Sequence, residues 1–160
     1  MKKILTVYFS YSGNTRIIAE QIHEIAGGDI MEIQAAEPYP EEYNDVVDQA
    51  RRELKSGRKP RLKSKSADIA SYDLIILGFP NWCGTFPAPI TTFLSENDLS
   101  GKTIAPFCTH EGGGSGRSAG DLSTWCPRST LLEGIAIRGR DVKGARSEVT
   151  EWLRKNKISD

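Results

Sequence analysis

The sequence predicts an α/β fold in which five parallel strands form a sheet covered by helices on both faces. Short continuous runs of apolar and β-branched residues are typical of strands buried on both faces. Between these runs, apolar residues recur at the three- and four-residue spacing of amphipathic helices. Because the 160 residues contain no linker-like stretch, repeat or break in composition, we expect one domain over 1–160.

The first half of the chain predicts two strands and two helices. The run at 4–9 is a buried strand, and Ile30 to Ile33 form a short second one. A helix between them ends at Gly27-Gly28. Its apolar positions are Ile17, Ile18, Ile22, Ile25 and Ala26. The spacing of apolar residues over 43–54 predicts the second helix.

The second half alternates in the same way. Strands are predicted at 74–79, 103–108 and 131–137. Helices are predicted at 90–94, 117–125 and 142–155. Pro106 lacks a backbone N–H and therefore removes one hydrogen bond from its strand. The last helix has Val149, Trp152 and Leu153 as its apolar stripe.

The charges balance in number but are segregated along the chain. Lys and Arg number 21, as do Asp and Glu, so there is no basic excess of the kind that nucleic-acid binding usually requires. Residues 29–48 nevertheless hold seven acidic residues and no basic one. Residues 51–65 contain eight basic residues and one acidic residue, Glu53. These eight are Arg51, Arg52, Lys55, Arg58, Lys59, Arg61, Lys63 and Lys65.

The cysteines, histidines and apolar runs indicate a cytoplasmic protein. Cys83, Cys108 and Cys126 cannot form a complete disulfide framework and are typical of small buried thiols in a reducing compartment. His23 and His110 are isolated, so we expect no metal site. The N-terminus lacks a signal-peptide pattern, and no apolar run is long enough to span a membrane.

Small polar residues fill the first strand-to-helix loop. Ser10, Ser12 and Thr15 supply hydroxyls, Asn14 supplies an amide, and Gly13 allows a close approach of the backbone. Together with the helix N-terminus these groups favour a phosphate held mainly by neutral donors. The loop matches neither the Walker A nor the dinucleotide fingerprint. The alternative is a simple turn with a helix cap.

Two further loops follow the strands at 74–79 and 103–108. In the first of these, Trp82 lies among Pro and Gly residues and offers a platform for a flat ligand. Its alternative is a Trp that packs at the edge of the core. The other loop, 109–116, contains four Gly residues and either lines a planar ring or forms a flexible surface loop. Because ligands of parallel sheets bind at the carboxyl ends of the strands, we expect the three loops to form one site.

The three motifs together resemble the flavodoxin-like family, in particular a bacterial subgroup of short members. Residues 8–15 (YFSYSGNT) resemble the phosphate-binding loop of that family, and 78–87 and 106–112 resemble its two isoalloxazine loops. The resemblance covers nearly the whole chain. It implies a flavodoxin-like three-layer sandwich, with a five-stranded parallel sheet of order 2-1-3-4-5, and FMN as the cofactor.

The resemblance also implies which residues bind the cofactor. The phosphate would be held by Ser10, Ser12, Gly13, Asn14 and Thr15. The isoalloxazine would lie against Trp82, with Pro80, Asn81, Cys83, Gly84 and Thr85 around it. Its opposite side would be lined by Thr109, His110, Glu111 and Gly112. The third loop lacks the aromatic residue of many flavodoxins, and Cys83 stands where the subgroup often has a second Trp, so the flavin would be less enclosed.

The first functional hypothesis is an FMN-dependent electron carrier, which needs no catalytic residue from the protein. The alternative is an FMN-dependent NAD(P)H or quinone-type oxidoreductase, in which His110 and Glu111 could contact the substrate. A third is an adaptor that has lost the flavin. Expected partners are a redox protein or a small electron donor or acceptor, not nucleic acid or a membrane, and we expect a monomer or a homodimer. Tyr39 and Tyr43 either cover the site or form a hydrophobic staple on the next helix.

Overall fold

The computed structural model describes residues 2–63 and 68–160 and confirms the predicted fold class. One parallel sheet has the strand order β2-β1-β3-β4-β5, and a further strand, β6, also pairs with β4. The strands are β1 (Ile4–Phe9), β2 (Asp29–Ile33), β3 (Leu74–Pro80), β4 (Thr103–His110), β5 (Thr130–Leu131) and β6 (Ile135–Arg138). Lys65, at the end of the basic stretch, lies outside the described residues.

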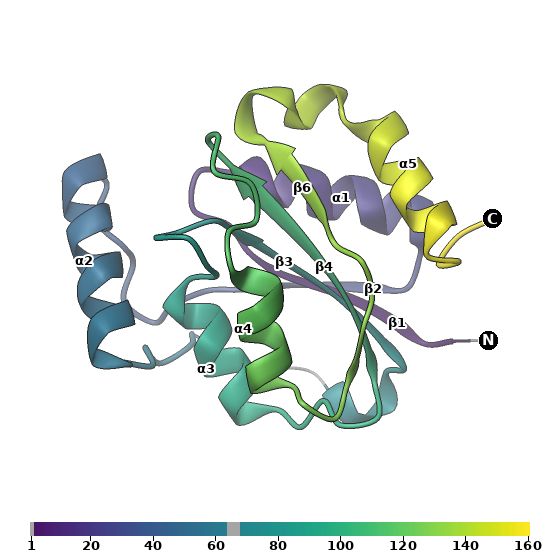
Figure 1. Ribbon diagram of the computed structural model, residues 1–160, viewed down its shortest axis with the longest axis horizontal. Helices are drawn as coiled ribbons and strands as arrows, with labels where there is room; N and C mark the ends of the chain where they lie inside the picture. The colour runs from purple at the N-terminus through teal and green to yellow at the C-terminus, as the bar shows by residue number, and fades with distance from the viewer. Residues whose placement is uncertain (1, 64–67) are drawn as a thin grey trace.

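Helices cover both faces of this sheet and make three layers. The α-helices are α1 (Asn14–Ala26), α2 (Tyr43–Ser56), α3 (Ala88–Glu96), α4 (Ser118–Trp125) and α5 (Arg146–Lys155). Two 3₁₀ segments are η1 (Ile69–Ser71) and η2 (Gly139–Gly144). Figure 1 shows α1 and α5 on one face of the sheet and α3 and α4 on the other.

The alternation of side chains along the strands separates the core into two halves. Leu5, Val7 and Phe9 of β1 belong to the cluster that α3 and α4 cover. Tyr8, the neighbour that points the other way, belongs with Ile22 to the cluster under α1 and α5. A strand between two helical layers must be apolar at successive positions, which explains the continuous runs in the sequence.

The predicted fifth strand at 131–137 is wrong as one continuous element, because the chain forms β5 and β6 with a break between them. The N–H of Leu132 still donates to Ile104 O of β4, at 2.9 Å. Alternate residues of a strand face the same neighbour, so the missing N–H of Pro106 falls on this same edge of β4. A Cβ on Gly134 would lie 2.9 Å from Pro106 O, so the chain passes closely where the ladder is interrupted.

Two other expectations from the sequence are corrected at the edges of the fold. The outer strands are not buried throughout, since Ile33 of β2 and Ile137 of β6 are the buried members of their strands. The final helix starts at Arg146 rather than at Val142, which lies in η2. Its apolar stripe, Val149, Trp152 and Leu153, is buried as predicted.

Helix α2 does not lie flat on the sheet. It stands beyond the carboxyl ends of the strands (Figure 1), and its main helical neighbour is α3. The two buried apolar residues of α2, Val46 and Ala50, join neither core cluster of the described chain. Among residues 2–63 and 68–160, no helix is long and apolar enough to cross a membrane.

Candidate functional site

The three predicted loops meet at the carboxyl ends of β1, β3 and β4. Their deepest link is a hydrogen bond of 2.7 Å between the hydroxyls of Thr15 and Thr109, both of which are buried. The N–H of Asn81 donates to Thr109 O at 2.8 Å, which joins the second loop to the same strand end. Residues far apart in the sequence are thereby fixed around one edge of the sheet.

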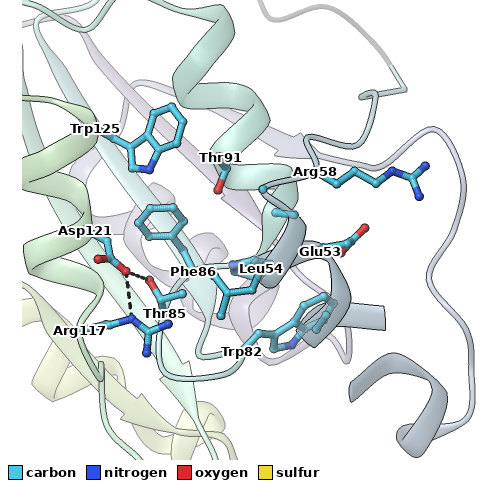
Figure 2. A pocket seen from close by; sticks show the side chains of 14 residues that line it. Glu53, Leu54, Arg58, Trp82, Thr85, Phe86, Thr91, Arg117, Asp121 and Trp125 are labelled. Carbon is cyan, nitrogen blue, oxygen red and sulfur yellow. Dashed lines mark hydrogen bonds and ion pairs between the residues drawn. The ribbon is translucent and has the colours of Figure 1, made fainter. Parts of the chain in front are cut away.

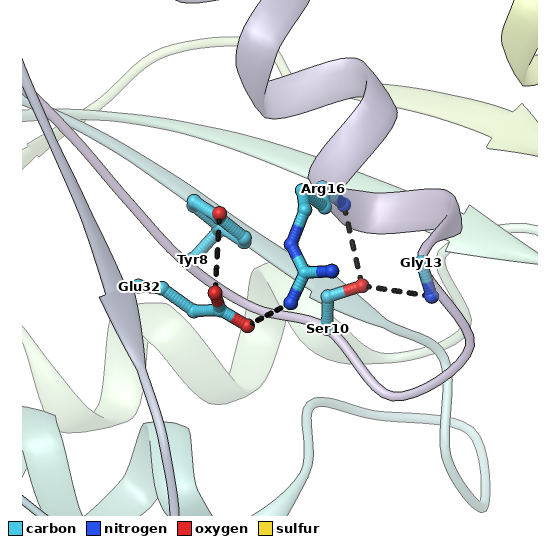
Figure 3. Close-up of polar contacts among 5 residues, drawn as sticks. All are labelled: Tyr8, Ser10, Gly13, Arg16 and Glu32. Carbon is cyan, nitrogen blue, oxygen red and sulfur yellow. Dashed lines mark hydrogen bonds and ion pairs between the residues drawn. The ribbon is translucent and has the colours of Figure 1, made fainter.

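The first loop turns into α1 around a single serine side chain. Ser10 Oγ accepts hydrogen bonds from the N–H of Gly13 at 3.2 Å and from the N–H of Arg16 at 3.3 Å (Figure 3). Gly13 has φ 100°, a conformation that favours glycine, and α1 begins at the next residue. The first N–H groups of α1, at Asn14 and Thr15, have no partner within the helix. Ser12 is exposed beside them.

The side chain of Arg16, the first basic residue after this loop in the sequence, is paired with another strand. Arg16 Nη2 pairs with Glu32 Oε2 of β2 at 2.6 Å, and Glu32 also accepts a bond of 3.5 Å from the hydroxyl of Tyr8 (Figure 3). The hydrogen bond with Glu32 raises the pKa of Arg16, and burial raises the pKa of Tyr8. The helix end and neutral donors are therefore what the loop offers an anion, as the sequence predicts.

The second loop is a tight turn from Trp82 to Thr85. Their backbone groups exchange hydrogen bonds of 2.9 and 3.2 Å. The two central residues, Cys83 and Gly84, have φ values of 56° and 85°, which makes this a type I′ turn. The side-chain oxygen of Asn81 accepts a hydrogen bond of 2.9 Å from the N–H of Gly84, which stabilises the turn.

Trp82 is half-buried and lies edge-on to three other rings. Its ring centroid is 4.9 Å from that of Tyr39, 5.5 Å from Phe9 and 5.7 Å from Tyr11. Trp82 thus packs at the edge of the core, as one sequence interpretation holds, and also lies at the predicted platform position. Tyr39 packs edge-on against Trp82, whereas Tyr43 is 77% exposed and therefore does not form the hydrophobic staple.

The third loop is tied to the second rather than loose. Asn81 Nδ2 donates to Gly114 O at 2.8 Å, and the N–H of Arg117 donates to Gly84 O at 2.8 Å. A Cβ on Gly116 would overlap Gly84 O, so only glycine allows this approach. The N–H of Gly112 donates to His110 Nδ1 at 2.9 Å.

The structure adds residues that the sequence interpretation leaves out. A Cβ on Gly139, just after β6, would lie 2.6 Å from Asn14 Nδ2 and 2.5 Å from Glu111 Oε1. Arg138 Nη2 donates to Glu111 O at 3.5 Å. The carboxyl end of β6 thus borders the first and third loops as well. The sequence signal for it is Gly139, two residues after the last predicted strand, and a Gly at such a position is common in turns.

The cysteines divide into one exposed and two buried thiols. Cys83 is exposed at the tip of its turn, so the expectation of a packed thiol is wrong for this residue, because the turn points its side chain outward. Cys108 and Cys126 are buried as expected. Burial raises the pKa of the Cys108 thiol to about 12 and also raises that of Cys126.

Comparisons with known proteins agree with this geometry. A family model described as flavodoxin matches residues 3–156. A candidate flavoprotein from Bacteroides eggerthii is 31% identical, with a TM-score of 0.85 over 97% of this chain and 98% of its own. A flavoprotein from Lactobacillus acidophilus, solved in complex with FMN, is 28% identical, with a TM-score of 0.75 over 95% of this chain and 99% of its own. A flavodoxin from the Archaea, 19% identical over 97% and 99% of the two chains, has a TM-score of 0.54 and shares the fold.

Proposed function

The chain belongs to the flavodoxin family, and from this premise we propose that it is an electron-transfer protein that holds FMN at the carboxyl ends of β1, β3 and β4. The observation that carries the proposal is the meeting of three loops around the buried Thr15–Thr109 bond. FMN supplies reversible electron chemistry when it is bound, so the protein has to bind it and control its surroundings.

We assign the phosphate to the first loop. Gly13, Ser12 and Asn14 surround the start of α1, where unpaired N–H groups and the positive end of the helix dipole attract an anion. Gly139 supports this fit, because any larger residue there would push Asn14 and Glu111 out of their positions. The hydroxyls of Thr15 and Thr109 bond to each other, so these two residues hold the loops together beneath the cofactor.

We assign the ring system to the second and third loops. Trp82 would face it, with the backbone of Pro80, Asn81, Cys83, Gly84 and Thr85 around it. Asn81 positions this wall, since its amide reaches both Gly84 and Gly114. On the other side, His110, Glu111 and Gly112 would line an open edge, because the third loop is largely exposed.

The phosphate assignment is tested by placing a negative charge beside it. Ser12→Glu changes an exposed residue and should weaken FMN binding by about tenfold or more, which is ~1.4 kcal/mol or more of charge repulsion. Binding of riboflavin, which has no phosphate, should be unchanged. Ser147→Glu, at an exposed position of α5, is the matched control. Equal FMN affinity in Ser12→Glu and the parent protein would refute the assignment.

Electron transfer is tested separately by how the bound cofactor is reduced. A carrier should take up its two electrons in two resolved steps during photoreduction followed by absorbance. It should also be reduced slowly by NADH or NADPH. A single two-electron bleaching step would argue against a carrier, and failure to bind FMN at all would refute both functions.

A second candidate is an FMN-dependent NAD(P)H or quinone oxidoreductase. The exposure of Glu111, Gly112 and Gly113 favours it, because a flat substrate needs open access to one side of the ring. Bleaching of the FMN-loaded protein within seconds of adding NADPH would establish this candidate over the carrier.

A further inference from the structure

A concave region of the surface is bordered by Trp82 of the second loop and by no residue of the first loop, 10–15. It is a cavity of about 320 Å³ between α2, the turn after β3, α3 and α4. We call it the Trp125 cavity after the exposed Trp125 of α4 at its margin. Ser12, Gly13 and Asn14 do not line it. Its volume is at the lower end of the range of ~300–1,000 Å³ found for small-molecule sites.

Aromatic and aliphatic side chains form much of the wall of this cavity. Figure 2 shows Trp125, Phe86 and Trp82 arranged around it, with Leu54 of α2 opposite α4. Trp125 and Leu54 are 39% and 46% exposed, although both are large apolar residues. Three rings around a small space offer stacking faces and edges to a flat ring system.

The acidic groups of the cavity are already engaged. Glu53 is 4% exposed and its carboxylate accepts a bond of 2.7 Å from the hydroxyl of Tyr39. Burial of that hydroxyl and its hydrogen bond to Glu53 raise the pKa of Tyr39, so the hydroxyl keeps its proton and donates to Glu53. Asp121 accepts the hydroxyl of Thr85 at 2.5 Å and pairs with Arg117 at 3.6 Å. Both carboxylates therefore accept hydrogen bonds within the wall, and Asp121 is also ion-paired.

The cations at the margin are less fully engaged. Lys59 Nζ lies 5.3 Å from the ring centroid of Trp125. Arg58 lines the cavity with its stem, and its guanidinium points outward (Figure 2). Neither Lys59 nor Arg58 forms an ion pair with another residue of 2–63 or 68–160. An anionic group on a ligand would meet positive charge here, beside the aromatic wall.

We propose that the Trp125 cavity binds a small planar aromatic anion, at a site separate from that of FMN. The ring would lie among Trp82, Phe86 and Trp125, and the anionic group would point to Lys59 at the margin. The proposal concerns binding alone and does not depend on which redox function the protein has. The cavity shares Trp82 and Thr85 with the proposed ring site, so a ligand bound here would lie beside the second loop.

The test is calorimetric titration with 2-naphthoate, a planar anion that flavin does not oxidise. Saturable binding with a 1:1 ratio is expected both in the apoprotein and in the protein saturated with FMN. Neutral 2-naphthamide should bind at least threefold more weakly than 2-naphthoate. Lys59→Gln should remove that difference without changing the affinity for the amide.

A plugged cavity provides the structural control. Thr91 of α3 lines the cavity, so Thr91→Phe should fill it and weaken 2-naphthoate at least tenfold while FMN binding persists. Ser95→Phe adds the same ring at an exposed position of α3 and should leave both affinities unchanged. The proposal is overturned if FMN competes with 2-naphthoate, if Thr91→Phe binds it normally, or if no saturable binding occurs at millimolar concentration. Loss of FMN binding alone would refute the proposed function and leave this site standing.

Discussion

Helices α1 and α2 follow neighbouring strands, yet α1 belongs to the body of the fold and α2 stands at the edge where the strands end. α1 presents Ile18, Ala19 and Ile22 to the sheet, and all three are fully buried. α2 buries Val46 and Ala50 together with a carboxylate, Glu53, which is held by Tyr39. A continuous apolar stripe is needed to cover a sheet face, and α2 lacks one. It stands instead at the strand ends, where its side chains line a cavity.

The sharpest test of this contrast is truncation of one buried side chain in each helix. Ile22→Ala should lower the free energy of unfolding by about 3 kcal/mol, because it leaves a void in a closed core. Val46→Ala should cost only about 1 kcal/mol, since α2 can settle around the smaller side chain. Urea unfolding followed by circular dichroism measures both. Equal losses would mean that α2 is as much a part of the core as α1.

A pair of glycines tests how closely the second and third loops must approach. Gly114 and Gly116 both have positive φ, so alanine should cost about 1 kcal/mol at either position. At Gly116 the added Cβ would also overlap the Gly84 carbonyl, whereas at Gly114 nothing lies within 4 Å. Gly116→Ala should therefore lose at least another 1 kcal/mol of stability and about tenfold in FMN affinity. Fluorescence titration with FMN, beside urea unfolding, compares the two variants.

The link between α2 and Trp82 is tested at alkaline pH. Burial and the bond to Glu53 raise the pKa of Tyr39 above its unfolded value near 10. Its contribution to stability is therefore complete below pH 10 and is lost as the pH rises further, by at most ~1.4 kcal/mol per pH unit. In Tyr39→Phe, the fall in the free energy of unfolding between pH 10 and 11 should be smaller by up to ~1.4 kcal/mol, because this group no longer titrates. At pH 7 the substitution should cost about 1 kcal/mol, because the hydrogen bond to Glu53 is lost. An unchanged slope of stability against pH would show that Tyr39 is not held as described.

The smallest effect is expected at the exposed turn. Cys83 should react with a thiol reagent at pH 8 in the folded protein, while Cys108 and Cys126 react only after unfolding, because both are buried with raised pKa values. Cys83→Gly should raise the free energy of unfolding by less than about 1 kcal/mol, since glycine adopts φ 56° without strain. Counting labelled thiols by mass spectrometry checks the first expectation. Labelling of two or three thiols in the native state would contradict it.

Local patterns were sufficient for the central strands, for the existence of the helices and for the composition of the loops. The run at 74–79 has no polar side chain, and the run at 4–9 has only Thr6 and the hydroxyl of Tyr8 among apolar residues, so both are predicted as central strands. The break at Gly134 was harder to predict from the sequence, because it depends on which edge of β4 lacks the N–H that Pro106 cannot supply. The burial of Glu53 could not be predicted either, since nothing near it in the sequence indicates that the hydroxyl of Tyr39 will donate a hydrogen bond to it.

The sequence by itself determined the α/β class and the positions and composition of the three loops, because these follow from residue type and spacing within short segments. Tertiary structure alone decided that Thr15 meets Thr109, that Gly139 closes the site, and that α2 lines a cavity beside Trp82. Each of these depends on distances between segments that only the packed sheet brings together. The charges show the same division, since Glu53, the one acidic residue of 51–63, is 4% exposed and leaves the basic residues of 51–63 as the charges at the surface of that segment.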